Sequence, residues 1–264
     1  FTHGPFGPVT WRNAFCFNPE TKIRLYNHEL EALKNLRLGY ILKDGSLVLA
    51  TIDINVEDKS IYEINNIEVT GNHFIKYKNR WIRVSNHPDA RMKEYSDNKV
   101  RCLVTTTGLI NIEDCIFRDY LDSHDLNVNN KIRRIVDSSL NPDGIDKVLD
   151  NKKCDNIMTG YYSKDDPEDS IGLVRIREEI LDMYTIGNNV VSGNIIVKYG
   201  KNWIRALNHP DAKYIGKNLQ KCKHFITESG IINLDNLVIR DFNENDNHKV
   251  NKNILDIVEE SLNK

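Results

Sequence analysis

Short apolar runs separated by turn residues dominate the first half of the chain. From residue 16 to about residue 122, β-branched and other apolar residues come in short runs, with turn signals such as 43–45 between them. Runs of this length and spacing are typical of antiparallel strands and predict an all-β body. Residues 131–140 instead place apolar side chains at helical spacing, which predicts a short closing helix. Residues 1–15 show no periodicity and are expected to be an extended lead-in.

The pattern then repeats with an offset of 122 residues. Residues 69–92 return as residues 191–214 with 13 of 24 positions identical, where unrelated segments share roughly one or two. The same offset relates 105–122 to 227–244 and 132–140 to 254–262. So long a period indicates a domain duplication and not a solenoid. We therefore predict an upstream segment over 1–15, a first β domain over 16–140 and a second over 141–264, each closed by a short helix.

Composition narrows the classes of function. The 36 basic and 38 acidic residues are mixed along the chain, so we expect neither a nucleic-acid partner nor binding to a membrane. No run approaches the roughly 18 apolar residues of a membrane span, and no signal peptide is visible. Five cysteines without CxxC spacing argue against a disulfide framework and a cysteine-rich metal site. They indicate a reducing compartment, with Cys102 and Cys115 as buried core thiols, and we expect no cofactor.

Cys16 and His73 are the leading candidates for chemistry. Cys16 opens an apolar run, and Thr70-x-x-His73 follows some fifty residues later. A thiol is the best protein nucleophile near neutral pH, and an imidazole can move its protons. A buried core thiol and a hydrogen-bonded core histidine are the alternatives. The second copy has Ile195 in place of His73, and in our alignment Ser139 in place of Cys16, so the two residues are lost together.

Residues that both copies retain are expected to be architectural. His87 and His209 lie in the repeated sequence NHPDA, which predicts a turn with side-chain-to-backbone bonds and not a metal site. Asp119 follows Arg118 at the end of a predicted strand, and the second copy repeats this pair. A structural ion pair is therefore favoured for Asp119, with a secondary catalytic role left open.

These residues together resemble a Hint domain, the self-processing fold of hedgehog proteins and inteins. The resemblance covers about 16–122, with a closing segment of the hedgehog type, and it extends more weakly to Hint modules in proteins of large viruses and phages. It is carried by CFNPETKIRL from Cys16, LKNLRLGYILKDG (33–45), TGNH (70–73) and CLVTTTGLINIEDCIFRDYLD (102–122). The second copy would be a degenerate tandem Hint domain.

Three departures from the family limit what the resemblance implies. Tyr40 stands where an acidic residue usually follows glycine, and Asp119 stands where hedgehog-type domains have a second cysteine. The His-Asn end of an intein is not visible either. Full splicing is therefore not expected from this chain.

The resemblance implies self-cleavage by an N-to-S acyl shift at Phe15–Cys16. Cys16 would attack the Phe15 carbonyl, His73 would protonate the Cys16 nitrogen, and Thr70 would position His73 or stabilise the oxyanion. Thr105, which aligns with a hedgehog-type threonine, and Asp119 would be supporting residues. The substrate would be the protein's own upstream polypeptide, and water or a thiol would accept the acyl group. The alternative is a non-catalytic structural or binding module of a larger protein, for example a viral one.

Overall fold

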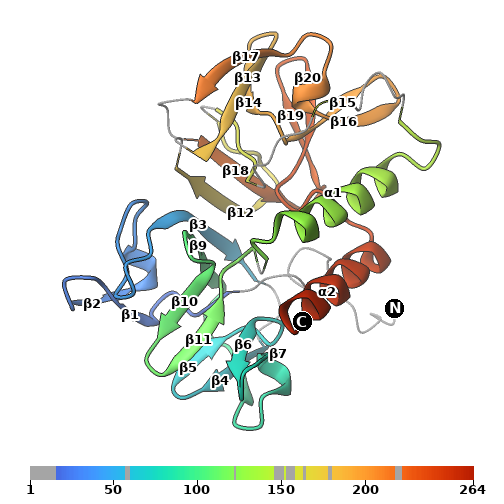
Figure 1. Cartoon of the computed structure of the whole chain (residues 1–264). Coiled ribbons are helices and arrows are strands. Elements are labelled where there is room, and N and C mark those ends of the chain that lie inside the picture. Colours follow the sequence, from blue (N-terminus) through green and yellow to red (C-terminus); the bar gives the residue numbers. More distant parts are fainter. Residues whose placement is uncertain are drawn as a thin grey trace. The chain divides into compact units, whose positions relative to one another are not determined.

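The chain is built mainly of antiparallel strands, as the sequence predicts for an all-β protein (Figure 1). The computed structural model describes residues 16–56, 60–121, 123–145, 152, 158–162, 165–177, 180–217 and 222–264. The predicted lead-in over 1–15 lies outside these residues. Packing divides the chain into two compact units, the first comprising Phe1–His124 with Leu255–Lys264 and the second Asp125–Ile254.

The strands of the first unit form four antiparallel groups within the described residues. Two groups are pairs: β1 (Lys22–Arg24) with β2 (Leu30–Ala32), and β3 (Val48–Asn55) with β9 (Lys99–Thr105). A three-stranded sheet has the order β5 (Ile67–Val69), β4 (Ser60–Ile64), β8 (Arg91–Glu94). A four-stranded sheet has the order β10 (Leu109–Ile112), β11 (Cys115–Arg118), β6 (Phe74–Tyr77), β7 (Arg80–Arg83).

The described strands of the second unit repeat three of these groups. The pair is β12 (Ser170–Ile176) with β18 (Cys222–Thr227). The three-stranded sheet has the order β14 (Asn189–Ser192), β13 (Asp182–Ile186), β17 (Lys213–Lys217). The four-stranded sheet has the order β19 (Ile231–Leu234), β20 (Leu237–Arg240), β15 (Ile196–Tyr199), β16 (Asn202–Arg205).

Strand register confirms the duplication residue by residue. Phe117 pairs with Ile75 in the first unit, and Ile239 pairs with Val197 in the second, at the same offset of 122. The β3–β9 pair shifts register between Val48 and Ala50, and the β12–β18 pair shifts at the equivalent place. The structural repeat therefore extends upstream of residue 69, where sequence identity fades.

Upstream of β3 the offset changes, because among the described residues the β1–β2 pair has no counterpart in the second unit. Phe17 bridges Val69 and Arg101, and Tyr161 makes the equivalent bridges in the second unit. Tyr161 therefore corresponds to Phe17 at an offset of 144, and Gly160 corresponds to Cys16. Our alignment of Ser139 with Cys16 is wrong, since Ser139 lies in the last turn of a helix, where its hydroxyl donates to the Val136 carbonyl.

Each predicted helix is present and longer than the pattern indicated. Helix α1 (Leu126–Leu140) begins at the N-cap Asp125, whose carboxylate accepts from two backbone amides of the first turn. Helix α2 (His248–Leu262) ends the chain. In Figure 1, α1 lies beside β16, and α1 groups with the second unit although it was predicted to close the first domain at residue 140.

Matching asparagines fix the two helix ends. Asn141, the C-cap of α1, exchanges two 2.8 Å hydrogen bonds with the backbone of Trp203. Asn263, which follows α2, makes the same two bonds with the backbone of Trp81, at 2.9 and 3.0 Å. These bonds hold α1 against β16 in the second unit and the end of α2 against β7 in the first.

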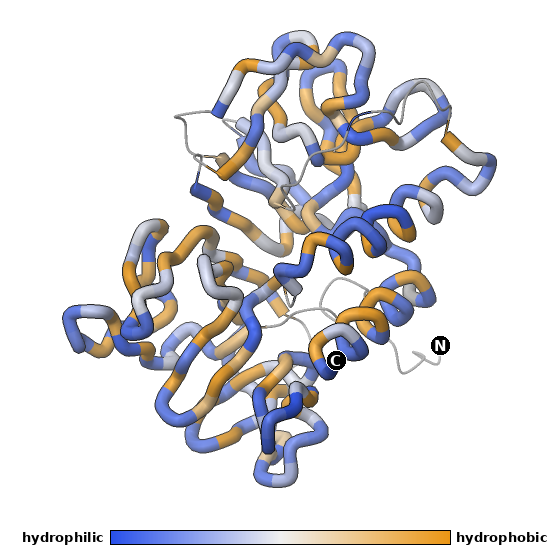
Figure 2. The backbone as a smooth tube through the Cα atoms, viewed as in Figure 1, coloured by the Kyte–Doolittle hydropathy of each residue, from blue (hydrophilic) through white to orange (hydrophobic). Residues whose placement is uncertain are grey.

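Each unit has an apolar interior. Figure 2 shows hydrophobic and hydrophilic positions alternating along much of the backbone of both units, as expected for strands with one buried face. In the first unit Phe17, Phe74 and Phe117 are fully buried, and in the second Tyr161 and Phe225 are. No helix of the described residues is long and apolar enough to cross a membrane.

Candidate functional site

Cys16 lies in an extended segment held between two strands of the first unit. The next residue, Phe17, exchanges two 2.8 Å backbone hydrogen bonds with Arg101 of β9. On the other side, Asn18 donates to the carbonyl of Glu68 in β5 at 3.0 Å. Cys16 and Phe17 have no exposed surface. The backbone around the proposed nucleophile is therefore fixed by strand pairing on both sides.

Thr70 contacts the backbone of Cys16 directly. The Cys16 amide donates to the Thr70 hydroxyl at 3.0 Å, and the Thr70 amide donates to the Cys16 carbonyl at 2.9 Å. The structure therefore brings together two of the predicted site residues at the nitrogen of the expected scissile bond. Phe15, on the other side of that bond, lies outside the described residues.

His73 is fully buried in the turn that Thr70 begins. Its Nε2 lies 2.7 Å from the Arg118 carbonyl, and its ring packs on Phe17 with centroids 4.6 Å apart. Burial lowers the pKa of His73 to about 4, against the opposing effects of the Arg118 carbonyl and the Asp119 carboxylate. The imidazole is therefore neutral near pH 7.

The side chains of Cys16 and Phe17 leave the segment in opposite directions, because successive side chains of an extended chain alternate. The Phe17 ring packs on the His73 ring, with centroids 4.6 Å apart. The nitrogen of Cys16 is held by the Thr70 hydroxyl. His73 and Cys16 are thus linked through the 70–73 turn, whose ends are joined by the His73 amide and the Thr70 carbonyl at 3.1 Å.

The side chains of Thr105 and Asp119 both bind backbone groups. The Asp119 carboxylate is fully buried. One of its oxygens accepts from the Thr105 amide at 2.9 Å and lies 2.9 Å from His124 Nε2. The other oxygen accepts from the Leu121 amide at 3.1 Å. The Thr105 hydroxyl closes a turn by bonding the backbone of Leu109. Asp241 accepts the two equivalent backbone bonds in the second unit, from the Thr227 and Asn243 amides, which supports a structural role for both carboxylates.

Cys102 is a member of the site that sequence reasoning treated only as core. It lies in β9 one residue beyond Arg101, opposite Cys16 in the strand register, and its fully buried thiol donates to the Leu103 carbonyl at 3.7 Å. Burial first, and then the neighbouring Cys16 thiol, raise the pKa of Cys102 well above its usual value. Its spacing from Cys16 gave no signal, because their proximity depends on strand register.

The second unit keeps the backbone of this site without its thiol. The Gly160 amide donates to the Ser192 hydroxyl at 2.9 Å, and the Ser192 amide donates to the Gly160 carbonyl at 2.8 Å. These bonds match those between Cys16 and Thr70. A Cβ atom at Gly160 would lie 3.0 Å from the side chain of Ile176, so this position is closely packed as well as lacking a nucleophile.

A different histidine supplies the imidazole of the second unit. His224 in β18 is equivalent to Cys102, yet its Nε2 lies 3.2 Å from the Arg240 carbonyl, the counterpart of the Arg118 carbonyl that His73 contacts. Its Nδ1 lies 3.0 Å from the Thr159 hydroxyl. Burial lowers the pKa of His224 to about 4. A buried imidazole at this carbonyl is therefore common to both units, although the residue that provides it differs.

The NHPDA segments form the predicted turns. The Asp89 amide donates to His87 Nδ1 at 3.2 Å, and the Asp211 amide donates to His209 Nδ1 at 3.1 Å. Each histidine ring also packs edge-on against a tyrosine, Tyr77 in the first unit and Tyr199 in the second. The prediction of side-chain-to-backbone turns is confirmed.

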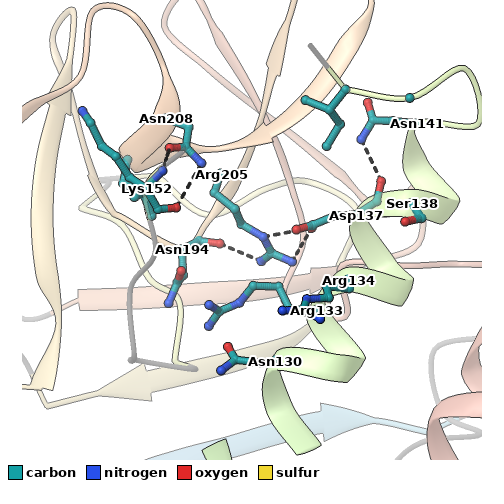
Figure 3. Close-up of a pocket in the computed structure, with 13 residues that line it drawn as sticks. Asn130, Arg133, Arg134, Asp137, Ser138, Asn141, Lys152, Asn194, Arg205 and Asn208 are labelled. Atoms are coloured by element: carbon teal, nitrogen blue, oxygen red, sulfur yellow. Dashed lines mark hydrogen bonds and ion pairs between the residues drawn. The ribbon is translucent and has the colours of Figure 1, made fainter. Parts of the chain in front are cut away.

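A pocket of about 280 Å³ in the second unit lies between α1 and the strand end at Arg205 (Figure 3). The buried Arg205 guanidinium bonds Asp137 at 2.7 Å, Glu244 at 2.6 Å and the Asn194 carbonyl at 2.8 Å. In the first unit Arg83 pairs with Glu259 of α2 in the equivalent way, at 3.3 Å. In each unit an arginine of a strand thus binds an acidic residue of a helix, so we regard both clusters as structural.

The described residues contain no group of histidine, cysteine, aspartate or glutamate side chains arranged to hold a metal ion. No protein-family model matches the chain, and no curated protein matches it either.

Proposed function

We propose that the first unit is an autoprocessing domain that converts the Phe15–Cys16 peptide bond into a thioester by an N-to-S acyl shift. The observation that carries the proposal is the hydrogen bond from the Cys16 amide to the Thr70 hydroxyl. It gives the nitrogen that must leave a direct side-chain partner, beside a thiol whose backbone is fixed on both sides. Cleavage would then occur without full splicing.

The acyl shift is an internal rearrangement with no net gain or loss of protons. The Cys16 sulfur attacks the Phe15 carbonyl carbon, the C–N bond breaks, and the proton lost by the thiol ends on the new amine. As the nitrogen loses its amide conjugation it becomes basic, and the Thr70 hydroxyl that accepts its N–H can turn to donate instead. Thr70 is accordingly the residue that touches the reacting nitrogen.

His73 serves this reaction as a proton carrier that is neutral at rest. Because the pKa of His73 is about 4, the ring is neutral near pH 7, and it would take up the proton that the Cys16 thiol loses before it passes one to the nitrogen. The imidazolium formed in this way would be a strong acid toward the departing amine. Asp119, whose charge raises the pKa of His73, would stabilise that transient cation.

Release of the upstream polypeptide completes the process. The thioester at Cys16 is open to attack by water or an external thiol, which takes the acyl group and regenerates the free thiol. The upstream polypeptide is therefore the substrate, and each molecule acts once.

A non-catalytic module is the second candidate, and the second unit favours it. That unit repeats three of the four strand groups of the first and has the equivalent backbone bonds at Gly160 and Ser192, but it has Gly160 where the first unit has Cys16. A duplicated β scaffold within a larger protein would need no chemistry from either unit. The resemblance to Hint modules of viral proteins is compatible with this candidate.

The deciding experiment is a mass spectrum of freshly purified protein with and without hydroxylamine, which cleaves thioesters. We expect hydroxylamine to produce a break between residues 15 and 16, and Cys16→Ala to remain intact. His73→Ala should slow the reaction by about 10²–10⁴. Cys222→Ala, which removes a buried thiol of the second unit, is the matched control and should cleave like the wild type. A wild-type chain that stays intact would favour the module.

A further inference from the structure

Cys16 and Cys102 lie directly opposite one another on neighbouring extended segments. The preceding pair in the register, Phe17 and Arg101, exchanges both of its backbone hydrogen bonds. In an antiparallel ladder the next opposed residues then form a non-hydrogen-bonded pair, with Cα atoms about 4.5 Å apart. The backbone of Cys16 bonds Thr70, on the other side of the segment, as this alternation requires.

This placement satisfies the backbone geometry of a disulfide bond. Bridged cysteines have Cα atoms about 4.4–6.8 Å apart with their Cβ atoms facing each other. Opposed residues of an antiparallel pair project their side chains to the same face, and the Phe17–Arg101 register places Cys16 opposite Cys102. The strand register therefore suits a sulfur–sulfur bond between the two residues.

We propose that Cys16 and Cys102 are a reversible disulfide site that switches the nucleophile of the first unit off when oxidised. Formation of the bond depends only on the two thiols. Its effect on cleavage rests on the proposed acyl shift, because only a free Cys16 thiol can attack the Phe15 carbonyl.

The oxidation is a thiol–disulfide exchange with a small disulfide. Cys16 as thiolate attacks the small disulfide, which gives a mixed disulfide and releases one small thiol. Cys102 as thiolate then attacks the Cys16 sulfur, forms the Cys16–Cys102 bond and releases the second small thiol. The protein loses two protons and two electrons, and the small disulfide is reduced to two thiols. A reducing agent reverses both steps.

Burial sets the rate of this exchange. Both cysteines have no exposed surface, so the oxidant has to enter through local opening of the segment. The pKa of Cys102 is raised by burial and by Cys16, which makes its thiolate scarce near pH 7. The second step should therefore accelerate as the pH rises.

Peptide mapping tests the disulfide without any reference to cleavage. The full chain is treated with oxidised mercaptoethanol, quenched in acid, alkylated and digested without reduction. We expect a fragment in which the peptides of Cys16 and Cys102 are linked, formed faster at higher pH. Alkylation of Cys102 after prolonged oxidation, or its linkage to Cys115 instead, would overturn the proposal.

Two variants serve as matched controls for the mapping. Cys102→Ala should abolish the linked fragment, with Cys102→Ser as a second version in case the alanine variant does not fold. Cys115→Ala, which removes the other buried thiol of a first-unit strand, should leave the linked fragment unchanged. Loss of the fragment in folded Cys115→Ala would contradict the assignment of the pair.

A second arm measures the effect on cleavage. Oxidised wild type, freed of small molecules, should resist hydroxylamine, and reduction with a phosphine should restore cleavage because a phosphine does not itself attack the thioester. Cys102→Ala has no second thiol to complete the exchange, so oxidation should leave mercaptoethanol on its Cys16, which the intact mass detects, whereas the oxidised wild type should carry none; an oxidised wild type that resists cleavage through retained mercaptoethanol on Cys16 would refute the switch. If reduced wild type never cleaves, the acyl shift fails, whereas the disulfide is judged by the peptide map alone.

Discussion

The hydroxyl of Thr70 accepts a 3.0 Å hydrogen bond from the amide nitrogen of Cys16. Ser192 holds the amide of Gly160 at 2.9 Å in the second unit, so the hydroxyl is kept where the thiol is absent. Part of its role is therefore architectural: it fixes the extended segment against the turn. In the first unit the same bond reaches the nitrogen that the proposed reaction must release.

The first prediction concerns this hydroxyl. Thr70→Val keeps the size of the side chain but removes its acceptor, and a lost hydrogen bond of about 1.5 kcal/mol, at the upper end of the usual range, corresponds to a slowing of roughly tenfold. Thr70→Ser retains the hydroxyl, as Ser192 does, and should cleave within about threefold of the wild-type rate. The measurement is the rate of hydroxylamine-dependent cleavage by mass spectrometry. Equal rates for the valine and serine variants would exclude a role for the hydroxyl in the reaction.

The second prediction concerns acid and the stability of the first unit. The pKa of His73 is lowered from 6.5 to about 4 in the folded protein by burial. As the pH falls the unfolded chain takes up the proton first, so the stabilisation is complete above about pH 6.5 and is lost toward pH 4. From about pH 7 to about pH 5 the cost should reach about 2 kcal/mol.

Hydrogen exchange of the β6 and β11 amides, corrected for intrinsic rates, reports this change for the first unit alone. The matched variant is His73→Ile, which introduces the residue that the second unit has at Ile195. It should be less stable near pH 7 but lose less stability on acidification. In the second unit, burial raises the pKa of Asp241 to about 6, which opposes the acid effect of His224. An equally steep acid response in His73→Ile would contradict this assignment.

The third prediction compares the two arginines that fasten the helices. Arg205 is buried with two carboxylates, Asp137 and Glu244, and Arg205→Met would leave both charges without their partner. Breaking a buried ion pair costs about 3–5 kcal/mol. Arg83 pairs with the more exposed Glu259, and because exposed pairs contribute little, Arg83→Met should cost about 1 kcal/mol.

Urea unfolding followed by hydrogen exchange of β16 and β7 separates the two effects. Arg205→Met should lower protection of β16, and Arg83→Met should lower that of β7 to a smaller extent. Arg205→Lys, which keeps the charge without the fork of donors, should give an intermediate value. Equal losses at the two sites would show that burial does not determine the strength of these pairs.

Several features could be predicted from the sequence because they depend on local pattern. Strand periodicity gave the all-β class, and the identities around Trp81 and Trp203 gave the duplication, whose register holds at Ile75 and Val197. The NHPDA turn followed from the chemistry of its own residues. The pairing of Thr70 with Cys16 was expected only through the resemblance, and its form, a hydroxyl on the nitrogen, was not.

Other features depended on contacts between distant segments. Gly160 corresponds to Cys16 because the first unit carries the additional β1–β2 pair, which shifts the alignment in a region without sequence identity. The unit to which α1 belongs could not be read from its helical spacing, since an amphipathic face does not specify which strand covers it. Asn141 and Arg205 decide that choice.

Local periodicity, composition and self-similarity determined the all-β class of this protein and its duplication, because each can be read directly from the order of residues along the chain. Only the tertiary structure decided that Cys102 faces Cys16 and that His224 replaces His73 at the equivalent carbonyl. Both depend on how strands far apart in the chain are aligned. A change of one residue in strand register would turn these side chains to the opposite face, and the sequence spacing of the residues does not reveal that alignment.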